Sequence, residues 1–344
     1  MTFSDNFRER WNEIWGIDLR SLALFRFALA SVIAVDLFRR MFFDLRAFHT
    51  DYGFLPRDWL IQADSLWRLN IYLANGEPWF AALLLTLTLL CALAMAFGYR
   101  TRLAVVLLFF LEGSLQNRNP LVLIGGDSLI MCLLFWAMFL PLGARWSVDA
   151  ALSVNPPPHR NLHVSWASAG LLVQVMSVYF FSAVLKNGAD WWPDGLAVYY
   201  TMELERYATP LGRWMTNFPL PMQAMSYYVY FLEWAGPVVV FLPLALRLLR
   251  PVRFGVMLML MAMHTGFILC MEIGHFPYVS LASLTAFLGS WFWDWAAKQR
   301  DHGRVTKIFY DRDCGFCYKM CLLFETFLVL PHAEIKPAQD DAET

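Results

Sequence analysis

The chain has 344 residues, of which 58% are hydrophobic and only 16% are charged. Soluble domains carry about 25% charged residues, and a mean hydropathy of +0.46 over this length exceeds what one globular core can hide. The composition excludes an ordinary soluble protein, and the net charge of −1 provides no basic face for nucleic acid. No small-residue cleavage site follows the first apolar run, so we expect that run to be an anchor rather than a signal peptide.

Eight apolar segments are candidates for membrane spans, each of which needs about 20 apolar residues. They are 21–40, 79–97, 103–122, 127–142, 165–185, 223–246, 253–271 and 277–294. The fourth is short, so we expect it to be tilted or half-buried. The 15 Trp and 29 Phe fit the aromatic enrichment of membrane interfaces. The sequence therefore predicts an all-α polytopic membrane bundle of about eight transmembrane helices.

Basic residues gather in the loops on one side of these spans. An even number of spans places both termini on that side, with Arg8, Arg10, Arg20, Arg100, Arg102, Arg145, Arg160, Arg247, Arg250, Arg253, Lys298 and Arg300. The other side holds two long loops, 41–78 and 187–222, which are rich in Asp and Glu. Asp64 is one of the acidic residues of the first loop. Because short cytoplasmic loops carry an excess of Lys and Arg, we expect a multi-pass inner-membrane protein with cytoplasmic termini. The acidic loops then face the periplasm or a lumen.

The pattern changes after Trp295. A charged linker, 298–304, leads to VTKIFYD, which alternates like a strand, and DCGFC predicts a turn. A helix over 318–330 and a second strand over 333–338 follow, which makes a β-α-β unit. The linker 153–163 contains three prolines and separates the fourth and fifth spans. We expect a transmembrane domain over 1–297 and a small C-terminal domain over 298–344.

Several ionisable residues lie inside or beside the spans, where charge is costly and tends to face a bundle interior or a cavity. Arg26 and Asp36 are nearly three helical turns apart, so each is expected to pair with another helix or to contact a ligand. Glu112 lies in the middle of the third span. Glu272 and His275 flank a short loop, and we expect both at the surface.

The segment after Glu112 is an interrupted helix. Pro120 and the Gly125–Gly126 pair break it, beside Arg118, Asn119 and Asp127. Non-helical backbone at membrane depth is tolerated only where it is buried in protein or lines a cavity. Two interpretations stay open: a substrate-binding site that includes Arg118, Asn119 and Asp127, or a re-entrant turn held by a structural Arg–Asp pair.

Lys186 ends the fifth span, next to Trp191 and Trp192. One interpretation is a lysine that anchors the helix at the membrane surface. The other is an amine in a partly apolar pocket, where desolvation favours the neutral form and the amine can act as a base. Glu233 and His264, in the sixth and seventh spans, are further substrate-binding candidates, although a single histidine on an apolar helix is more often a hydrogen-bonded core residue.

The six cysteines divide into two groups. Three lie singly in apolar runs, where cysteine is usually a small core residue: Cys91, Cys132 and Cys270. Cys314 and Cys317 form a C-x-x-C motif at an expected helix start, and Cys321 follows. A helix N-terminus favours the thiolate, so we expect Cys314 to attack and Cys317 to resolve. A half zinc site or two idle thiols are the alternatives, but no second C-x-x-C completes a zinc site, and no metal is predicted.

Four stretches resemble the HTTM family, which is related to the vitamin K-dependent gamma-carboxylase. They are FRFALASVIAVDLFRR, FGYRTR, NRNP with GGD, and YFFSAVLKNGADW, and the resemblance covers roughly residues 15–295. The last is the most specific, and Lys186 takes the position of the carboxylase's catalytic lysine. The resemblance implies a base that deprotonates a reduced, vitamin K-like quinone, whose oxyanion reacts with oxygen and so drives proton abstraction from a glutamate.

The chain departs from the carboxylase in two ways. Arg118 stands where the carboxylase has a histidine important for activity, and arginine cannot shuttle protons at neutral pH. The large lumenal domain that grips the protein substrate has no counterpart here. Both departures weigh against glutamate carboxylation, and related chemistry on a quinone or another lipophilic small molecule stays open.

The C-terminal segment KIFYDRDCGFCYKMC resembles the start of a DCC-type thiol-disulfide oxidoreductase. The matching residues are Asp311, Asp313, Cys314 and Cys317. The resemblance implies a partial thioredoxin-like fold that exchanges disulfides with a thiol partner.

Two functions from different classes follow. The first is a membrane enzyme that acts on a quinone-like substrate through Lys186, coupled to the cytoplasmic C-x-x-C motif. The second is a transporter or a non-enzymatic accessory protein, in which the broken helix at Pro120 forms the substrate site. A closed pocket around Lys186 favours the enzyme, and a water-filled passage favours transport.

Overall fold

The structure is a computed structural model that describes residues 11–63, 69–154, 160–242, 249–300, 305–328 and 333–340. Several predictions concern residues outside these ranges: Arg8, Arg10, Asp64, Arg247, the centre of the 153–163 linker, the end of the 223–246 span and 301–304. The described chain is mostly helical and divides into two compact units. Unit 1 comprises 1–16, 121–136 and 164–287, and unit 2 comprises 17–120, 137–163 and 288–344.

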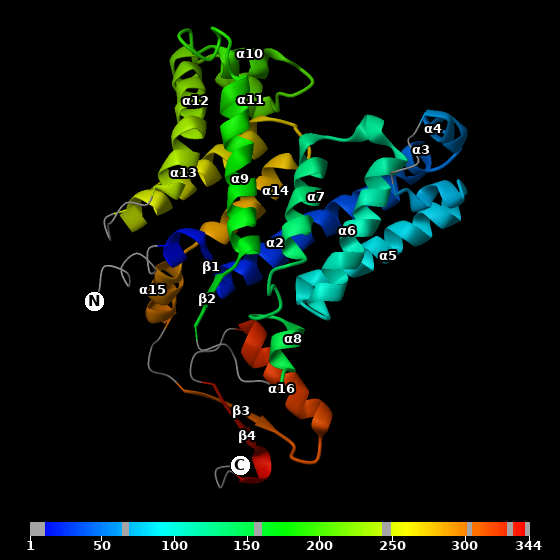
Figure 1. Ribbon diagram of the computed structural model, residues 1–344, viewed down its shortest axis with the longest axis vertical. Helices are drawn as coiled ribbons and strands as arrows, with labels where there is room; N and C mark the ends of the chain where they lie inside the picture. The colour runs from blue at the N-terminus through cyan, green and yellow to red at the C-terminus, as the bar shows by residue number, and fades with distance from the viewer. Residues whose placement is uncertain are drawn as a thin grey trace. The chain divides into compact units, whose positions relative to one another are not determined.

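Unit 1 is a helical bundle centred on α12, which packs against α9, α10 and α13 (Figure 1). Helix α13 also contacts α11 and α14. The Ser165 and Ser168 side chains form a capping box that starts α9, and prolines in the first turn start α11, α12 and α14. The helices are α7 (Gly125–Ala137), α9 (Trp166–Leu185), α10 (Ala197–Glu203), α11 (Pro210–Met215), α12 (Pro219–Phe241), α13 (Leu249–Cys270), α14 (Phe276–Leu284) and η4 (Thr285–Phe287).

Unit 2 is built on the packing of α2 against α5 and of α5 against α6. Gly98 adopts the left-handed conformation that ends α5, and the Asp149 carboxylate accepts hydrogen bonds from the backbone of Arg100 and Thr101, where α6 begins. Its helices are α2 (Leu19–Arg39), η1 (Arg40–Asp44), α3 (Leu45–His49), α4 (Arg57–Ala63), η2 (Ile71–Ala74), α5 (Pro78–Phe97), α6 (Thr101–Arg118), η3 (Pro120–Val122), α8 (Val148–Ala151) and α15 (Ser290–Arg300). Two short strands, β1 (Gly16–Asp18) and β2 (Leu162–Val164), pair with each other.

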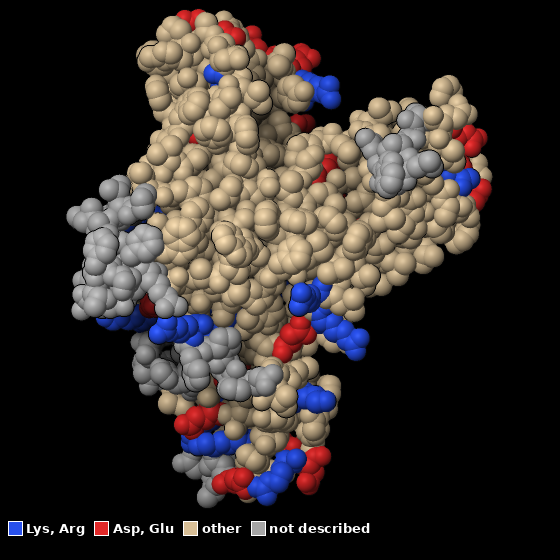
Figure 2. Space-filling view, viewed as in Figure 1, with Lys and Arg blue, Asp and Glu red and all other residues tan. Residues whose placement is uncertain are grey.

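Among the described residues, four helical segments are long and apolar enough to cross a membrane: Leu19–His49, Pro78–Phe97, Trp166–Leu185 and Arg250–Cys270. Figure 2 shows a wide surface with few charged side chains, as lipid contact requires. Helices α6 and α12 coincide with expected spans, but ionisable residues in α6 and the glutamate, prolines and tyrosines of α12 lower their hydropathy. A membrane protein is therefore supported, and the number of spans stays a prediction.

The last expected span is interrupted. Helix α14 ends at Leu284 and η4 at Phe287, and a separate helix, α15, begins at Ser290. Gly289 lies at the break, and the Ser21 hydroxyl donates a hydrogen bond to the Leu288 carbonyl there. The apolar run over 277–294 thus contains a helix break, because glycine weakens a helix without changing the hydropathy of the segment.

The C-terminal segment forms the expected β-α-β unit. Strands β3 (Thr306–Tyr310) and β4 (Ala333–Pro337) pair in parallel, with Thr306 opposite Ala333 and Tyr310 opposite Pro337. Helix α16 (Gly315–Leu328) connects them and packs on α8, and η5 (Ala338–Asp340) follows β4. The likeness to a thioredoxin-like fold stays a prediction.

Candidate functional site

Lys186 and Glu233 form a largely buried pair in unit 1. Helix α9 ends at Leu185, and the Lys186 amine turns back to donate to the Ser182 hydroxyl at 2.5 Å. The same amine donates to the Glu233 carboxylate on α12. The Lys186 side chain is 13% exposed and that of Glu233 is 6% exposed. A lysine that only anchored a helix at the membrane surface would keep its amine in water, so this geometry favours a site.

This pair lines a cavity of about 370 Å³, here called the Lys186 cavity, whose walls are mostly apolar. The volume lies in the range of pockets that hold small organic molecules. The Trp191 ring also lines it and faces the amine, with its centroid 4.9 Å from the Lys186 Nζ atom. An apolar chamber with few convergent polar groups is the usual form of a small-molecule site.

A second polar group lines the same cavity. The Tyr179 hydroxyl and the His264 Nε2 atom lie 2.9 Å apart, and both side chains are buried. The other ring nitrogen of His264, Nδ1, has no hydrogen-bond partner among the described residues. Buried polar atoms are normally paired, so this nitrogen is available to a bound molecule.

Sequence reasoning found Lys186, Glu233 and His264 separately, and the structure brings all three to the Lys186 cavity. Tyr179 and Ser182 were missed as site residues. Their spacing to Lys186, i to i+3 and i+7, places all three on one face of α9 and is the signal that would have found them.

Asp127 lies elsewhere in unit 1, in the first turn of α7. Its carboxylate accepts a hydrogen bond from the Ile124 backbone at 2.8 Å and lies 3.6 Å from the His275 Nε2 atom. His275, expected at the surface, has an 11% exposed side chain, whereas Glu272 is exposed as expected. A Cβ atom on Gly126 would lie 2.5 Å from the His275 ring, so glycine there permits this close approach. The contacts point to a structural start of α7, and substrate binding by Asp127 stays a prediction.

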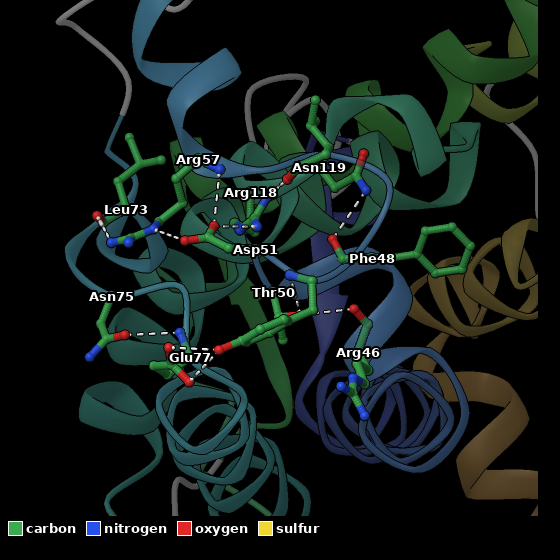
Figure 3. A network of polar contacts seen from close by, with 12 residues as sticks. Arg46, Phe48, Thr50, Asp51, Arg57, Leu73, Asn75, Glu77, Arg118 and Asn119 are labelled. Atoms are coloured by element: carbon green, nitrogen blue, oxygen red, sulfur yellow. Dashed lines mark hydrogen bonds and ion pairs between the residues drawn. The ribbon is translucent and has the colours of Figure 1, made fainter.

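Arg118 and Asn119 belong to unit 2, where they hold the loop between α3 and α5 (Figure 3). The fully buried Arg118 guanidinium donates to the Leu55 carbonyl at 2.8 Å and lies 3.6 Å from the Asp51 carboxylate. The Asn119 amide donates to the Phe48 carbonyl at 3.1 Å. The arrangement matches the structural interpretation of this segment more closely than a substrate site, which stays untested.

Arg26 and Asp36, also in unit 2, have different partners. The Arg26 guanidinium donates to three backbone carbonyls, those of Leu142, Arg145 and Trp146. Asp36 forms ion pairs with Arg39 at 3.5 Å and with Arg40 at 2.5 Å, about one turn further along the chain. Both residues thus have structural partners.

Comparison with known proteins assigns the chain to a family. A family model for the HTTM domain matches residues 16–295. The chain belongs to the HTTM domain family. No curated protein and no solved structure matched it. The matched range contains every residue that lines the Lys186 cavity, so this cavity belongs to the HTTM domain.

The C-x-x-C motif lies outside the HTTM domain. Cys314 caps α16, and the Cys317 backbone N–H donates to the Cys314 Sγ atom at 3.3 Å. Hydrogen bonds from the side chain and the backbone of Cys317 lower the pKa of the Cys314 thiol, and the reciprocal contact raises the pKa of Cys317. Both are free thiols and half-buried, and Cys321 is buried. The arrangement suits a thiolate nucleophile at Cys314.

Proposed function

We propose that the chain is a membrane enzyme in which the Lys186 amine acts as a base toward a lipophilic acid, such as the hydroxyl of a reduced quinone. The contact between Lys186 and Glu233 beside an apolar cavity carries this proposal. The amine lies within hydrogen-bond reach of the Glu233 carboxylate and beside the space that a lipophilic hydroxyl would occupy, which is the geometry that a general base needs.

The other residues of the cavity have matching roles in this proposal. Lys186 takes the proton of the bound hydroxyl, and Glu233 stabilises the resulting ammonium. Tyr179 and His264 offer a second hydrogen-bonding position. The apolar walls, with Trp191, hold the ring of the ligand and exclude water. The resemblance of YFFSAVLKNGADW to the carboxylase segment supports Lys186 as the base. Carboxylation is not included, because Arg118 stands in place of the carboxylase histidine.

The test is oxidation of a reduced quinone by oxygen, which yields quinone and hydrogen peroxide, catalysed by the purified protein in lipid nanodiscs. A general base contributes about 10²–10⁴-fold to rate, so Lys186→Ala should lower oxygen uptake by at least about 100-fold. Lys186→Arg keeps the positive charge, but arginine stays protonated at neutral pH and cannot act as a base, so this variant should be equally inactive. Lys298→Ala, at an exposed position, is the control and should retain the wild-type rate.

Equal rates for wild type and Lys186→Ala would remove the lysine base. If the wild type binds the quinone, measured by quenching of tryptophan fluorescence, but never turns it over, the protein is a carrier or an accessory protein instead. Unchanged quenching in Lys186→Ala and Glu233→Gln would place the ligand outside the Lys186 cavity.

We also propose that the protein crosses the inner membrane about eight times with both termini in the cytoplasm. Helices occupy each of the first seven expected spans, and the basic residues favour one side. Lys186 then opens toward the periplasm, and the C-terminal thiols lie on the opposite face.

We further propose that Cys314 and Cys317 exchange disulfides with a thiol partner, as the resemblance to DCC-type oxidoreductases implies. Because the pKa of Cys314 is lowered and that of Cys317 is raised, Cys314 should react with iodoacetamide at lower pH than Cys317. Mass spectrometry of alkylated peptides across a pH series measures this order. Cys317→Ala removes the hydrogen-bonding thiol and should shift the Cys314 profile to higher pH. Identical profiles for the two thiols would contradict an activated Cys314.

A further inference from the structure

Six sulfur-bearing side chains pack together in unit 1. This sulfur cluster consists of Met202, Met215, Met222, Met225, Cys270 and Met271. The Cys270 thiol lies 3.7 Å from the Met215 thioether sulfur. Met202, Met222 and Cys270 are buried, while Met215, Met225 and Met271 are half-buried. Because Met225 and Met271 also line the Lys186 cavity, the cluster combines an enclosed centre with a side that is open to this cavity.

The backbone holds the cluster in place. Residues 207–209 pair with the end of α13. Ala208 and Met271 form an isolated antiparallel β-bridge, and the Thr209 N–H donates a hydrogen bond to the Cys270 carbonyl at 3.1 Å. A Cβ atom on Gly212 would lie 2.3 Å from the Cys270 carbonyl oxygen and 2.8 Å from the Met202 sulfur. Glycine at 212 is thus required for Met202 and Cys270 to converge on α11, which also carries Met215.

We propose that the sulfur cluster binds a monovalent copper ion, Cu(I). Thioether and thiolate ligands are soft and select Cu(I), whereas Mg²⁺ and Ca²⁺ require oxygen ligands. Sulfur lies about 2.3 Å from a d¹⁰ ion such as Zn²⁺, so two sulfurs on one tetrahedral ion lie about 3.8 Å apart. The separation of Cys270 and Met215 is 3.7 Å, and these atoms need little movement to bind one ion. The Cys270 thiol releases its proton as its thiolate binds Cu(I), and Met215 and Met202 bind through neutral sulfur.

The copper proposal does not rest on the proposed base chemistry, although Met202, Met225 and Met271 also line the Lys186 cavity. A quinone assay alone therefore cannot separate the two proposals. The test is therefore metal binding rather than turnover.

The parent protein for the test is the full chain with Cys314, Cys317 and Cys321 replaced by serine, because those thiols also bind soft metals. Cu(I) is titrated into this parent in competition with a chromophoric chelator. A single Cu(I) ion per chain should bind, and X-ray absorption should show sulfur ligands alone. Cys270→Ser and Met215→Leu should each weaken Cu(I) affinity by more than the roughly 10–100-fold that is typical when a residue contacting the metal ligands, rather than a ligand itself, is replaced.

Met259→Leu, at an exposed position on the same helix as Cys270, is the matched control and should leave the affinity unchanged. Met215→Leu conserves volume, so thermal unfolding should show that it folds like the parent. Methionine can also fill a core without any metal. No bound copper in the parent, or equal affinity in the parent, Cys270→Ser and Met215→Leu, would assign the cluster to packing alone and overturn the copper site.

Discussion

Replacing Lys186 by methionine should destabilise the protein by about 3–5 kcal/mol, and replacing Glu233 by leucine should have a similar effect, whereas the double replacement should cost far less. Each single change leaves one group without its partner among apolar walls. Removing both leaves apolar side chains of similar volume beside an apolar cavity. Breaking a buried pair is costly, while exchanging the whole pair for apolar groups is often neutral.

The measurement is a double-mutant cycle on the free energy of unfolding in mixed detergent micelles. The control cycle uses Arg250 and Glu13, an ion pair in the same unit with side chains 46% and 49% exposed. Exposed pairs contribute about 0–1 kcal/mol, so that cycle should show little coupling. If the effects of the Lys186 and Glu233 substitutions simply add, the two residues do not act as a buried pair.

The sequence predicted where most helices lie, because hydropathy and proline or glycine breaks are local signals. It also placed Lys186 at the end of a span, where α9 ends. The C-terminal strands and the helix between them were predicted for the same reason, since period-two alternation and a turn motif lie within a short segment.

The pairing of Lys186 with Glu233 could not be predicted. The two residues are 47 positions apart on different helices, and periodicity does not say which helix faces which. His275 was expected at the surface because it lies in a short loop, but Gly126 lets its ring approach the start of α7. Such contacts depend on tertiary packing, which a single sequence does not record.

The role of Arg118 was left open between two interpretations because residue type alone does not separate them. Arginine, asparagine and a proline break are equally typical of a substrate site and of a loop anchor. The acceptors favour the loop anchor without testing the substrate site: Arg118 and Asn119 donate to the main-chain carbonyls of Leu55 and Phe48. A substitution at Arg118 therefore tests a structural role that the sequence could only propose.

Arg118→Met should destabilise unit 2 by roughly 3 kcal/mol, because it leaves the buried Leu55 carbonyl without its donor and removes a positive charge beside Asp51. Arg118→Lys should rescue only part of this loss, since an ammonium lacks the planar fork that reaches both acceptors. Arg102→Met, at an exposed position on the same helix as Arg118, is the control and should change the unfolding free energy by no more than about 0.5 kcal/mol. Unfolding free energies, with hydrogen exchange of residues 51–62, measure these effects.

The acid sensitivity of the same loop gives an independent check. Burial alone raises the pKa of Asp51, but hydrogen bonds from Arg57 and the charges of Arg57 and Arg118 outweigh it and lower that pKa. The Asp51 carboxylate therefore binds a proton more readily in the unfolded chain than in the folded one. The stabilisation that Asp51 gives to the folded state is present above its ordinary pKa and is lost as the pH falls through its folded pKa. Protection of the loop from exchange should decline at acid pH in the wild type and less steeply in Asp51→Asn. If Arg118→Met has wild-type stability and the same acid profile, the guanidinium does not hold this loop, and a ligand becomes the better explanation for a buried arginine at this position.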